Sequence, residues 1–136
     1  MRPTHLLDTT VYSQPLRPKP LGSVERRWTA LGDARVCTSV ICEAEVLTGL
    51  ERKGSKRLWK AYREILEGRV PLLDVDAGVA RAYSTLAAGL LAAGRPHPAF
   101  DLLIASTAKA HGLVVATLNV RHFAGLDGVA VEDWST

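Results

Sequence analysis

The stretch PAFDLLIASTAKAHGLVVAT, residues 98–117, joins two patterns that decide the fold. Its first part, 98–111, has the spacing of a helix, with Pro98 suited to the first helical turn and Gly112 standing where a C-terminal cap would be. Its second part, LVVAT (113–117), has the length and the β-branched content of a strand. A helix that leads directly into an apolar strand favours an α/β domain.

The same alternation of apolar runs and helical patterns continues outward along the chain. Further strands are predicted at 5–7, 35–40, 70–75 and 129–133. Further helices are predicted at 20–32, 42–53, 56–68 and 77–93. Strands that alternate with helices in this way indicate an α/β domain with a central, mainly parallel sheet.

The length of 136 residues fits one domain with a single core, and we expect that domain to span residues 1–136. The longest uncharged stretch, between Ala82 and Gly94, is shorter than the roughly 20 apolar residues that a transmembrane helix needs. No signal peptide is expected, because the apolar run at 6–7 is followed at once by Asp8. We therefore expect a soluble, cytoplasmic protein that does not engage a membrane.

Composition argues against redox and nucleotide chemistry. Cys37 and Cys42 are the only cysteines, too few for a disulfide framework or a four-ligand zinc site, so we expect both in the core. Neither a Walker A loop nor a G-x-G-x-x-G loop occurs. Lysine and arginine crowd together between residues 52 and 63, and such a cluster attracts phosphate backbones in some proteins but is more often a solvated helix face.

Asp101 is a lone carboxylate in a largely apolar helical segment. One interpretation is a carboxylate in the first turn that complements the helix dipole. The other is a functional carboxylate, because Ile104, Ala105 and Ala108 share its helix face and place it on the buried side. The helix by itself leaves the two interpretations equally open, and a second carboxylate at the same place would favour the functional one.

Asp8 is such a carboxylate, because it directly follows the first predicted strand. It could equally cap a short helix that begins after it. In open parallel sheets, ligands bind beyond the carboxyl ends of the strands, and the segment TLNVRH (117–122) follows the fourth strand. We therefore expect Asp8 and this segment to lie at the same edge of the sheet, within reach of Asp101.

The helix predicted at 42–53 offers a third carboxylate, but Glu43 and Glu45 lie on different faces of it. Glu43 shares its face with large apolar residues. Glu45 lies beside the small Thr48 and Gly49, which would leave an open hollow. Periodicity does not decide between the two glutamates.

Four segments, closed by VEDW (131–134), carry a resemblance that covers nearly the whole chain. They are LLDTTVYS (6–13), TSVICEAEVLTGL (38–50), GRPHPAFDLLIASTAKAHGL (94–113) and VATLNVRHF (115–123). In this order and spacing they resemble the PIN-domain ribonucleases, specifically the VapC/FitB-like toxins of toxin–antitoxin pairs. The resemblance implies a PIN-like three-layer α/β/α sandwich with a central, mainly parallel sheet.

By this resemblance the catalytic, metal-binding carboxylates are Asp8, Glu45 and Asp101, which selects between the two glutamates. Three carboxylates suit Mg²⁺ or Mn²⁺, which activates water and stabilises charge on a phosphate. Many relatives carry a fourth acidic residue where this chain has Asn119 or His122. Asn119 is expected to ligate directly or through water, whereas His122 could bind a softer ion such as Mn²⁺ or be a surface histidine. One tightly held cation is expected rather than two.

Small hydroxyl residues at strand ends could orient the carboxylates or cap helices. These residues are Thr9, Ser39 and Thr117.

Positively charged side chains near the proposed site are candidate contacts for RNA phosphates. These residues are Arg121, Arg52 and Lys53.

The function that the resemblance implies is a divalent-metal-dependent endoribonuclease, the toxin of a toxin–antitoxin pair, which hydrolyses phosphodiester bonds in tRNA or rRNA and so inhibits translation. It also implies a homodimer and a cognate antitoxin protein that occupies the catalytic groove. Two alternatives stay open. The altered fourth acidic position fits a catalytically weak, RNA-binding or regulatory module, and some distant relatives are structure-specific DNA nucleases.

Overall fold

The computed structural model describes residues 2–136 and has a five-stranded sheet at its centre. The strands are β1 (His5–Leu7), β2 (Val36–Ser39), β3 (Leu72–Leu73), β4 (Val114–Thr117) and β5 (Ala130–Asp133). Their order across the sheet is β3-β2-β1-β4-β5, and every neighbouring pair is parallel. The prediction of a mainly parallel central sheet is therefore confirmed.

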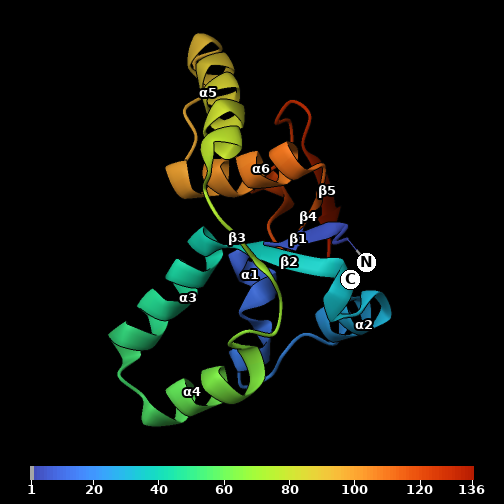
Figure 1. Ribbon diagram of the computed structural model, residues 1–136, viewed down its shortest axis with the longest axis vertical. Helices are drawn as coiled ribbons and strands as arrows, with labels where there is room; N and C mark the ends of the chain where they lie inside the picture. Colours follow the sequence, from blue (N-terminus) through green and yellow to red (C-terminus); the bar gives the residue numbers. More distant parts are fainter. Residues whose placement is uncertain (1) are drawn as a thin grey trace.

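Helices cover the sheet in the order that the alternating pattern predicts. Within residues 2–136 the α-helices are α1 (Thr9–Tyr12), α2 (Gly22–Leu31), α3 (Val40–Lys53), α4 (Lys56–Ala61), α5 (Ala77–Ala92) and α6 (Ala99–His111). Figure 1 shows α5 and α6 on one side of the sheet and α1 to α4 on the other, which is the expected three-layer arrangement. None of the described helices combines the length and the apolar character needed to cross a membrane.

The carboxyl ends of β1, β2 and β4 meet at one edge of the sheet. Leu7, the last residue of β1, pairs with Thr38 of β2 and with Ala116 of β4. Two of these strands lead directly into helices, because Asp8 is the N-cap of α1 and Ser39 is the N-cap of α3. Since α6 leads back toward the amino end of β4, its first turn also lies toward this edge.

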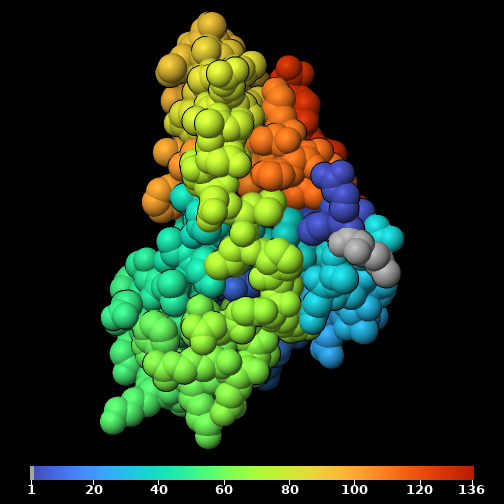
Figure 2. Space-filling model, viewed as in Figure 1, coloured from blue at the N-terminus to red at the C-terminus, as the bar shows by residue number. Residues whose placement is uncertain are grey.

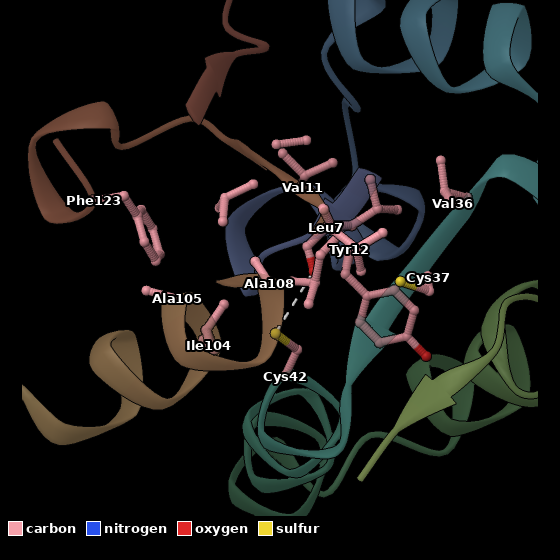
Figure 3. Packing of buried hydrophobic residues seen from close by; sticks show 14 of the residues in the cluster. Leu7, Val11, Tyr12, Val36, Cys37, Cys42, Ile104, Ala105, Ala108 and Phe123 are labelled. Atoms are coloured by element: carbon pink, nitrogen blue, oxygen red, sulfur yellow. Dashed lines mark hydrogen bonds between the residues drawn. The ribbon is translucent and has the colours of Figure 1, made fainter. Parts of the chain in front are cut away.

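The central strands are buried on both faces, as expected for a parallel sheet between two layers of helices. Leu6 and Leu7 are both 0% exposed. Figure 3 shows the side chains around Leu7 packed together from β1, β2, α1 and α6. Cys37 and Cys42 are free and buried, which confirms that they belong to the core, and burial raises the pKa of Cys42 to about 11.

The junction between β2 and α3 lies earlier than predicted. The strand expected at 35–40 ends at Ser39, and the helix expected at 42–53 begins at Val40. Ser39 Oγ accepts a hydrogen bond from the Ile41 N–H at 3.0 Å. An apolar run at such a junction fits a strand or a helix equally well, and the cap decides where the helix begins.

The edge strand β3 is shorter than the predicted 70–75. Only two residues form the strand, and the Thr38 N–H donates to the Pro71 carbonyl just before it at 3.0 Å. Proline has no N–H to donate to a neighbouring strand. Beyond β3 the chain turns away to reach Asp76, the N-cap of α5.

The helix expected at 56–68 is interrupted. After α4 the chain forms a π turn over Tyr62–Leu66, closed by a hydrogen bond from the Glu67 N–H to the Tyr62 carbonyl at 2.8 Å. Gly68 follows with a φ of 71°, a left-handed conformation that glycine adopts readily at the end of a helix. Periodicity alone does not distinguish this wider turn from an α-helix.

Candidate functional site

Asp8 is the first residue after β1 and is almost completely buried, with 3% of its surface exposed. Its Oδ1 accepts hydrogen bonds from the Val11 N–H at 3.1 Å and from the Thr10 hydroxyl at 2.6 Å. Its Oδ2 accepts a hydrogen bond from the Thr117 hydroxyl at 2.5 Å. The bond from Val11 is the helix cap that the sequence allowed, so Asp8 is at once an N-cap and a buried carboxylate at the sheet edge.

The charge of Asp8 has no cationic side chain as a partner among the residues that the structure describes. Burial raises the pKa of Asp8 above its ordinary value, although the hydrogen bonds from Thr10, Thr117 and Val11 act in the opposite direction. A buried carboxylate is costly unless it is paired or bound to a metal. Asp8 is therefore suited to hold a cation.

Thr9 connects the second candidate carboxylate to this corner. Its hydroxyl donates to Glu45 Oε1 at 2.5 Å. Glu43 instead accepts a hydrogen bond from the Tyr12 hydroxyl at 3.2 Å, and burial together with the Glu43 charge raises the pKa of Tyr12. The two glutamates thus contact different residues of α1, and Glu45 contacts the residue next to Asp8.

The surface beside Glu45 is open, as the sequence predicted. A Cβ atom added at Gly49 would meet no other atom within 4 Å. Thr48 is exposed, and its hydroxyl donates back to the Ala44 carbonyl at 2.8 Å. A ligand can therefore approach Glu45 along this side of α3.

Asp101 lies in the first turn of α6, with 24% of its side chain exposed. Ile104, Ala105 and Ala108 are all buried, which confirms the predicted inner face of this helix. Asp101 Oδ2 lies 3.0 Å from His122 Nδ1. The sequence left His122 between a metal ligand and a surface histidine, and the structure shows that its ring contacts the carboxylate of Asp101.

The segment 117–122, which begins at the last residue of β4, contacts both aspartates. Thr117 at its start donates to Asp8, and His122 at its end contacts Asp101. Asn119 lies between them, where its N–H donates to Thr117 Oγ1 at 2.8 Å and its carbonyl accepts from the His122 N–H at 3.0 Å. The prediction that Asp8 and residues 117–122 lie at the same edge of the sheet is therefore confirmed.

Two of the three predicted hydroxyl residues contact a carboxylate, namely Thr9 and Thr117. Ser39 takes the alternative role, because it caps α3. Thr10 was not identified from the sequence. Its hydroxyl nevertheless donates to the carboxylate of Asp8 and accepts from the Leu118 N–H at 3.0 Å. Its position within one turn of a helix N-cap was the available signal.

The three carboxylates are each hydrogen-bonded within the protein. Among residues 2–136, no three His, Cys, Asp or Glu side chains lie close enough together to hold one metal ion. The donor chemistry nevertheless suits a hard divalent cation, which takes carboxylate and other oxygen ligands. The buried Asp8, which lacks a Lys or Arg partner in the described chain, is the feature that fits such an ion best.

One cavity of the protein lies away from these carboxylates. It has a volume of about 250 Å³ and is lined by residues that include Leu21, Trp28 and Arg69, but by none of the three acidic residues. Small-molecule sites are usually concave and mostly apolar. This cavity lies apart from the three acidic residues, so it is not part of the candidate site.

Basic residues lie on two elements near the carboxylates. Arg52 and Lys53 are exposed in the last turn of α3. Arg52 follows Glu45 by two helical turns, so the two share a face and lie about 10 Å apart along the axis. Arg121 is exposed beside His122 in the turn after β4. These exposed positive charges suit contacts with a polyanion.

Comparison with known proteins identifies relatives along nearly the whole chain. The PIN domain family model matches residues 5–129. The tRNA(fMet)-specific endonuclease VapC of Shigella flexneri is 33% identical over 130 residues, covering 96% of this chain and 97% of that protein. Toxin FitB of Neisseria gonorrhoeae is 34% identical over 137 residues, covering 95% of this chain and 97% of that protein.

Solved structures agree with these matches. The DNA-bound VapBC structure from Salmonella typhimurium contains a chain with a TM-score of 0.85 and 30% identity, covering 97% of this chain and 98% of that chain. The FitAcB structure from Neisseria gonorrhoeae contains one with a TM-score of 0.85 and 33% identity, covering 96% of this chain and 98% of that chain.

Proposed function

The chain belongs to the PIN-domain family, and on that premise we propose that it is an endoribonuclease that acts as the toxin of a toxin–antitoxin pair. The relatives that it matches over nearly their full length are named as VapC endonucleases and as toxin FitB. The observation that carries the proposal is the position of Asp8, Glu45 and Asp101, on three elements that meet at one edge of the sheet.

We propose that Asp8, Glu45 and Asp101 hold Mg²⁺ or Mn²⁺, with Asn119 as a further oxygen donor, directly or through water. When bound, such an ion makes water nucleophilic near neutral pH and stabilises charge on the phosphate oxygens. The protein's own contribution is to orient the acidic side chains. The Thr117 hydroxyl, for example, holds Asp8 in place by donating a hydrogen bond of 2.5 Å to its Oδ2.

The substrate in this proposal is RNA, in particular tRNA or rRNA. Arg121, Arg52 and Lys53 support it, because all three are exposed and none forms an ion pair within residues 2–136. Cations that are free of acidic partners are available for phosphate oxygens, which account for most contacts in protein–nucleic acid interfaces. These residues would bind the RNA backbone and present a phosphodiester bond to the acidic edge.

We also propose a homodimer and a cognate antitoxin as partners. Solved relatives are described as VapBC and FitAB complexes, which supports a protein partner of the antitoxin type.

The homodimer is supported by apolar surface on α5 and α6, where Leu91 is 71% exposed and Phe100 is 53% exposed. Figure 2 shows α5, in yellow, as a ridge at the outer end of the molecule, accessible to a second copy.

The direct test is cleavage of bulk tRNA and rRNA by the purified protein. We expect cleavage with Mn²⁺ or Mg²⁺, none with EDTA, and a loss of about 100-fold or more in the Asp101→Asn variant, which keeps the side-chain volume but removes the charge. Gel electrophoresis of the RNA measures cleavage with the divalent ion, with EDTA and by the Asp101→Asn variant. Cleavage that persists in EDTA would contradict the metal-dependent mechanism.

The same variant provides a test in cells. Expression of the wild-type protein should arrest growth, and expression of Asp101→Asn at the same level should not. Equal growth arrest by both proteins would count against RNA cleavage as the cause. Binding of RNA without cleavage under any of the metal conditions would favour the RNA-binding alternative.

The two glutamates of α3 form a matched pair for a second prediction. Glu45→Gln should lower the rate of RNA cleavage by about 100-fold or more, because a neutral amide holds a cation far less well than a carboxylate. Glu43→Gln should keep most of the wild-type rate, because Glu43 contacts Tyr12 on another part of α1. Single-turnover cleavage rates measure the difference, and an equal loss in both variants would refute this assignment.

A further inference from the structure

We propose that His122 is a nitrogen ligand next to Asp101, and that this nitrogen makes the metal site select Mn²⁺ over Mg²⁺. The inference rests on the proposed function for the existence of that metal site. It adds a ligand that the acidic residues do not supply, and it assigns a metal preference to this particular chain.

The first argument is the distance between the two side chains. His122 Nδ1 lies 3.0 Å from Asp101 Oδ2. Two neighbouring ligands of an octahedral ion, each about 2.1 Å from it, are separated by about 3.0 Å. An ion bound to this oxygen of Asp101 would therefore have the imidazole nitrogen within coordination distance after only a small shift of the ring.

The second argument is that the backbone holds this histidine in place. The His122 carbonyl accepts a hydrogen bond from His97 Nε2 at 2.7 Å, and its N–H donates to the Asn119 carbonyl at 3.0 Å. His97 directly precedes Pro98, the N-cap of α6, which is the helix that carries Asp101. The turn that presents His122 is thus tied to the same helix end as its carboxylate partner.

The third argument is that the side chain is free to change partners. The ring of His122 is half-exposed, with 49% of its side-chain surface accessible. The contact with Asp101 is the one interaction of this ring found within residues 2–136. A nitrogen that now faces the carboxylate can instead face an ion bound to that carboxylate, without the loss of any other contact.

The fourth argument concerns the ion itself. Both ions bind carboxylate oxygens, but Mn²⁺ is a transition metal and accepts an imidazole nitrogen as one of its ligands more readily than Mg²⁺ does. A histidine in place of a fourth carboxylate also replaces an oxygen donor, which Mg²⁺ prefers, with a nitrogen donor. The mixed donor pair of Asp101 and His122 therefore shifts the preference of the site toward Mn²⁺.

A spectroscopic experiment tests ligation without any RNA. Full-length protein loaded with Mn²⁺ should show ¹⁴N coupling in pulsed electron paramagnetic resonance, and His122→Ala should lose it. His111→Ala is the matched control and should keep the coupling, because His111 is exposed at the far end of α6, about 15 Å along the axis from Asp101. Absence of coupling in the wild type, absence of Mn²⁺ binding, or coupling that survives in His122→Ala would overturn the proposal.

An affinity measurement tests the selectivity. The ratio of the Mg²⁺ to the Mn²⁺ dissociation constant should fall by about tenfold or more in His122→Asp relative to the wild type. An unchanged ratio would overturn the proposed preference. RNA cleavage is measured separately, so a protein with ¹⁴N coupling that cuts no RNA refutes only the proposed function. A protein that cuts RNA without ¹⁴N coupling refutes only the role of His122.

Discussion

Replacing Asp8 with asparagine should lower RNA cleavage by about 100-fold or more without lowering the stability of the protein in EDTA. Asparagine has nearly the same shape and is as good an N-cap as aspartate, so the hydrogen bond from the Val11 N–H is kept. The substitution removes a buried charge that has no Lys or Arg partner in the described chain. It also replaces Oδ2, which accepts from the Thr117 hydroxyl, with an amide N–H group that can donate to the oxygen of that hydroxyl instead. Asp8 therefore serves function at a cost to stability.

The pH dependence of unfolding shows in which direction the charge of Asp8 changes the stability of the protein. Burial raises the pKa of Asp8 in the folded protein above its value in the unfolded chain. Its contribution to stability is therefore fully present below the unfolded pKa and is lost as the pH rises through the folded pKa. The wild type should lose stability relative to Asp8→Asn across that window, and urea unfolding of both proteins in EDTA at a series of pH values measures the difference.

Asp8→Ala is the control for the cap. It removes the same charge but also leaves Thr10, Thr117 and the Val11 N–H without their acceptor. We expect it to be inactive as well and to be about 1–3 kcal/mol less stable than Asp8→Asn. If Asp8→Asn were as unstable as Asp8→Ala near neutral pH, the account of Asp8 as a buried charge without a partner would be wrong.

Replacing Trp134 with alanine should lower the free energy of unfolding by about 3–5 kcal/mol, a large part of the roughly 5–15 kcal/mol that stabilises a typical domain. Trp134 is 0% exposed. Its carbonyl accepts from the Ser23 hydroxyl at 2.8 Å, and its N–H donates to the Thr117 carbonyl at 2.9 Å. The residue thus joins α2 to the end of β4, next to the acidic edge.

Urea unfolding of Trp134→Ala and of Trp59→Ala provides the comparison. Trp59 is only partly buried, against Tyr62 at a ring-centroid distance of 5.9 Å, so its loss should leave a smaller defect. Equal destabilisation by the two substitutions would contradict the assignment of Trp134 as the central anchor of the C-terminal segment.

Trp134→Phe separates the indole hydrogen bond from the apolar packing. The Trp134 indole N–H donates to Glu132 Oε1 at 2.9 Å and is the main cause of the lowered pKa of Glu132. A lowered pKa contributes stability that is present above the unfolded pKa and is lost as the pH falls through the folded pKa. The phenylalanine variant should therefore lose less stability on acidification than the wild type does.

The alternation of strands and helices was predictable because it depends on local patterns. Apolar runs such as HLL before Asp8 mark strands that are buried on both faces. The helices predicted to begin at 56 and 77 do begin there in the structure, where Ser55 and Asp76 are their N-caps. The errors lie at the β2–α3 junction, where the Ser39 cap decides the start of the helix, and at β3 and the Tyr62–Leu66 turn. There the outcome depends on hydrogen bonds to distant strands or on a wide turn, which leave no periodic signal.

The candidate site was predictable to a different degree at each residue. Asp8 could be placed from the sequence, because the end of an apolar strand in a parallel sheet is also the edge where ligands bind. Glu43 and Glu45 could not be separated by periodicity, since both are partly buried on the same helix. Their hydrogen bonds to different residues of α1, Thr9 and Tyr12, distinguish them in the folded protein.

By itself, the sequence determined the parallel α/β fold and the edge at which Asp8 and residues 117–122 meet, because the alternation of strands and helices and the helix faces follow from local spacing. Only the tertiary structure decided that His122 turns its ring toward Asp101. The direction of a side chain in a short turn depends on what holds the turn, and here that is His97, which lies 25 residues earlier in the chain. Such a contact leaves no trace in local spacing.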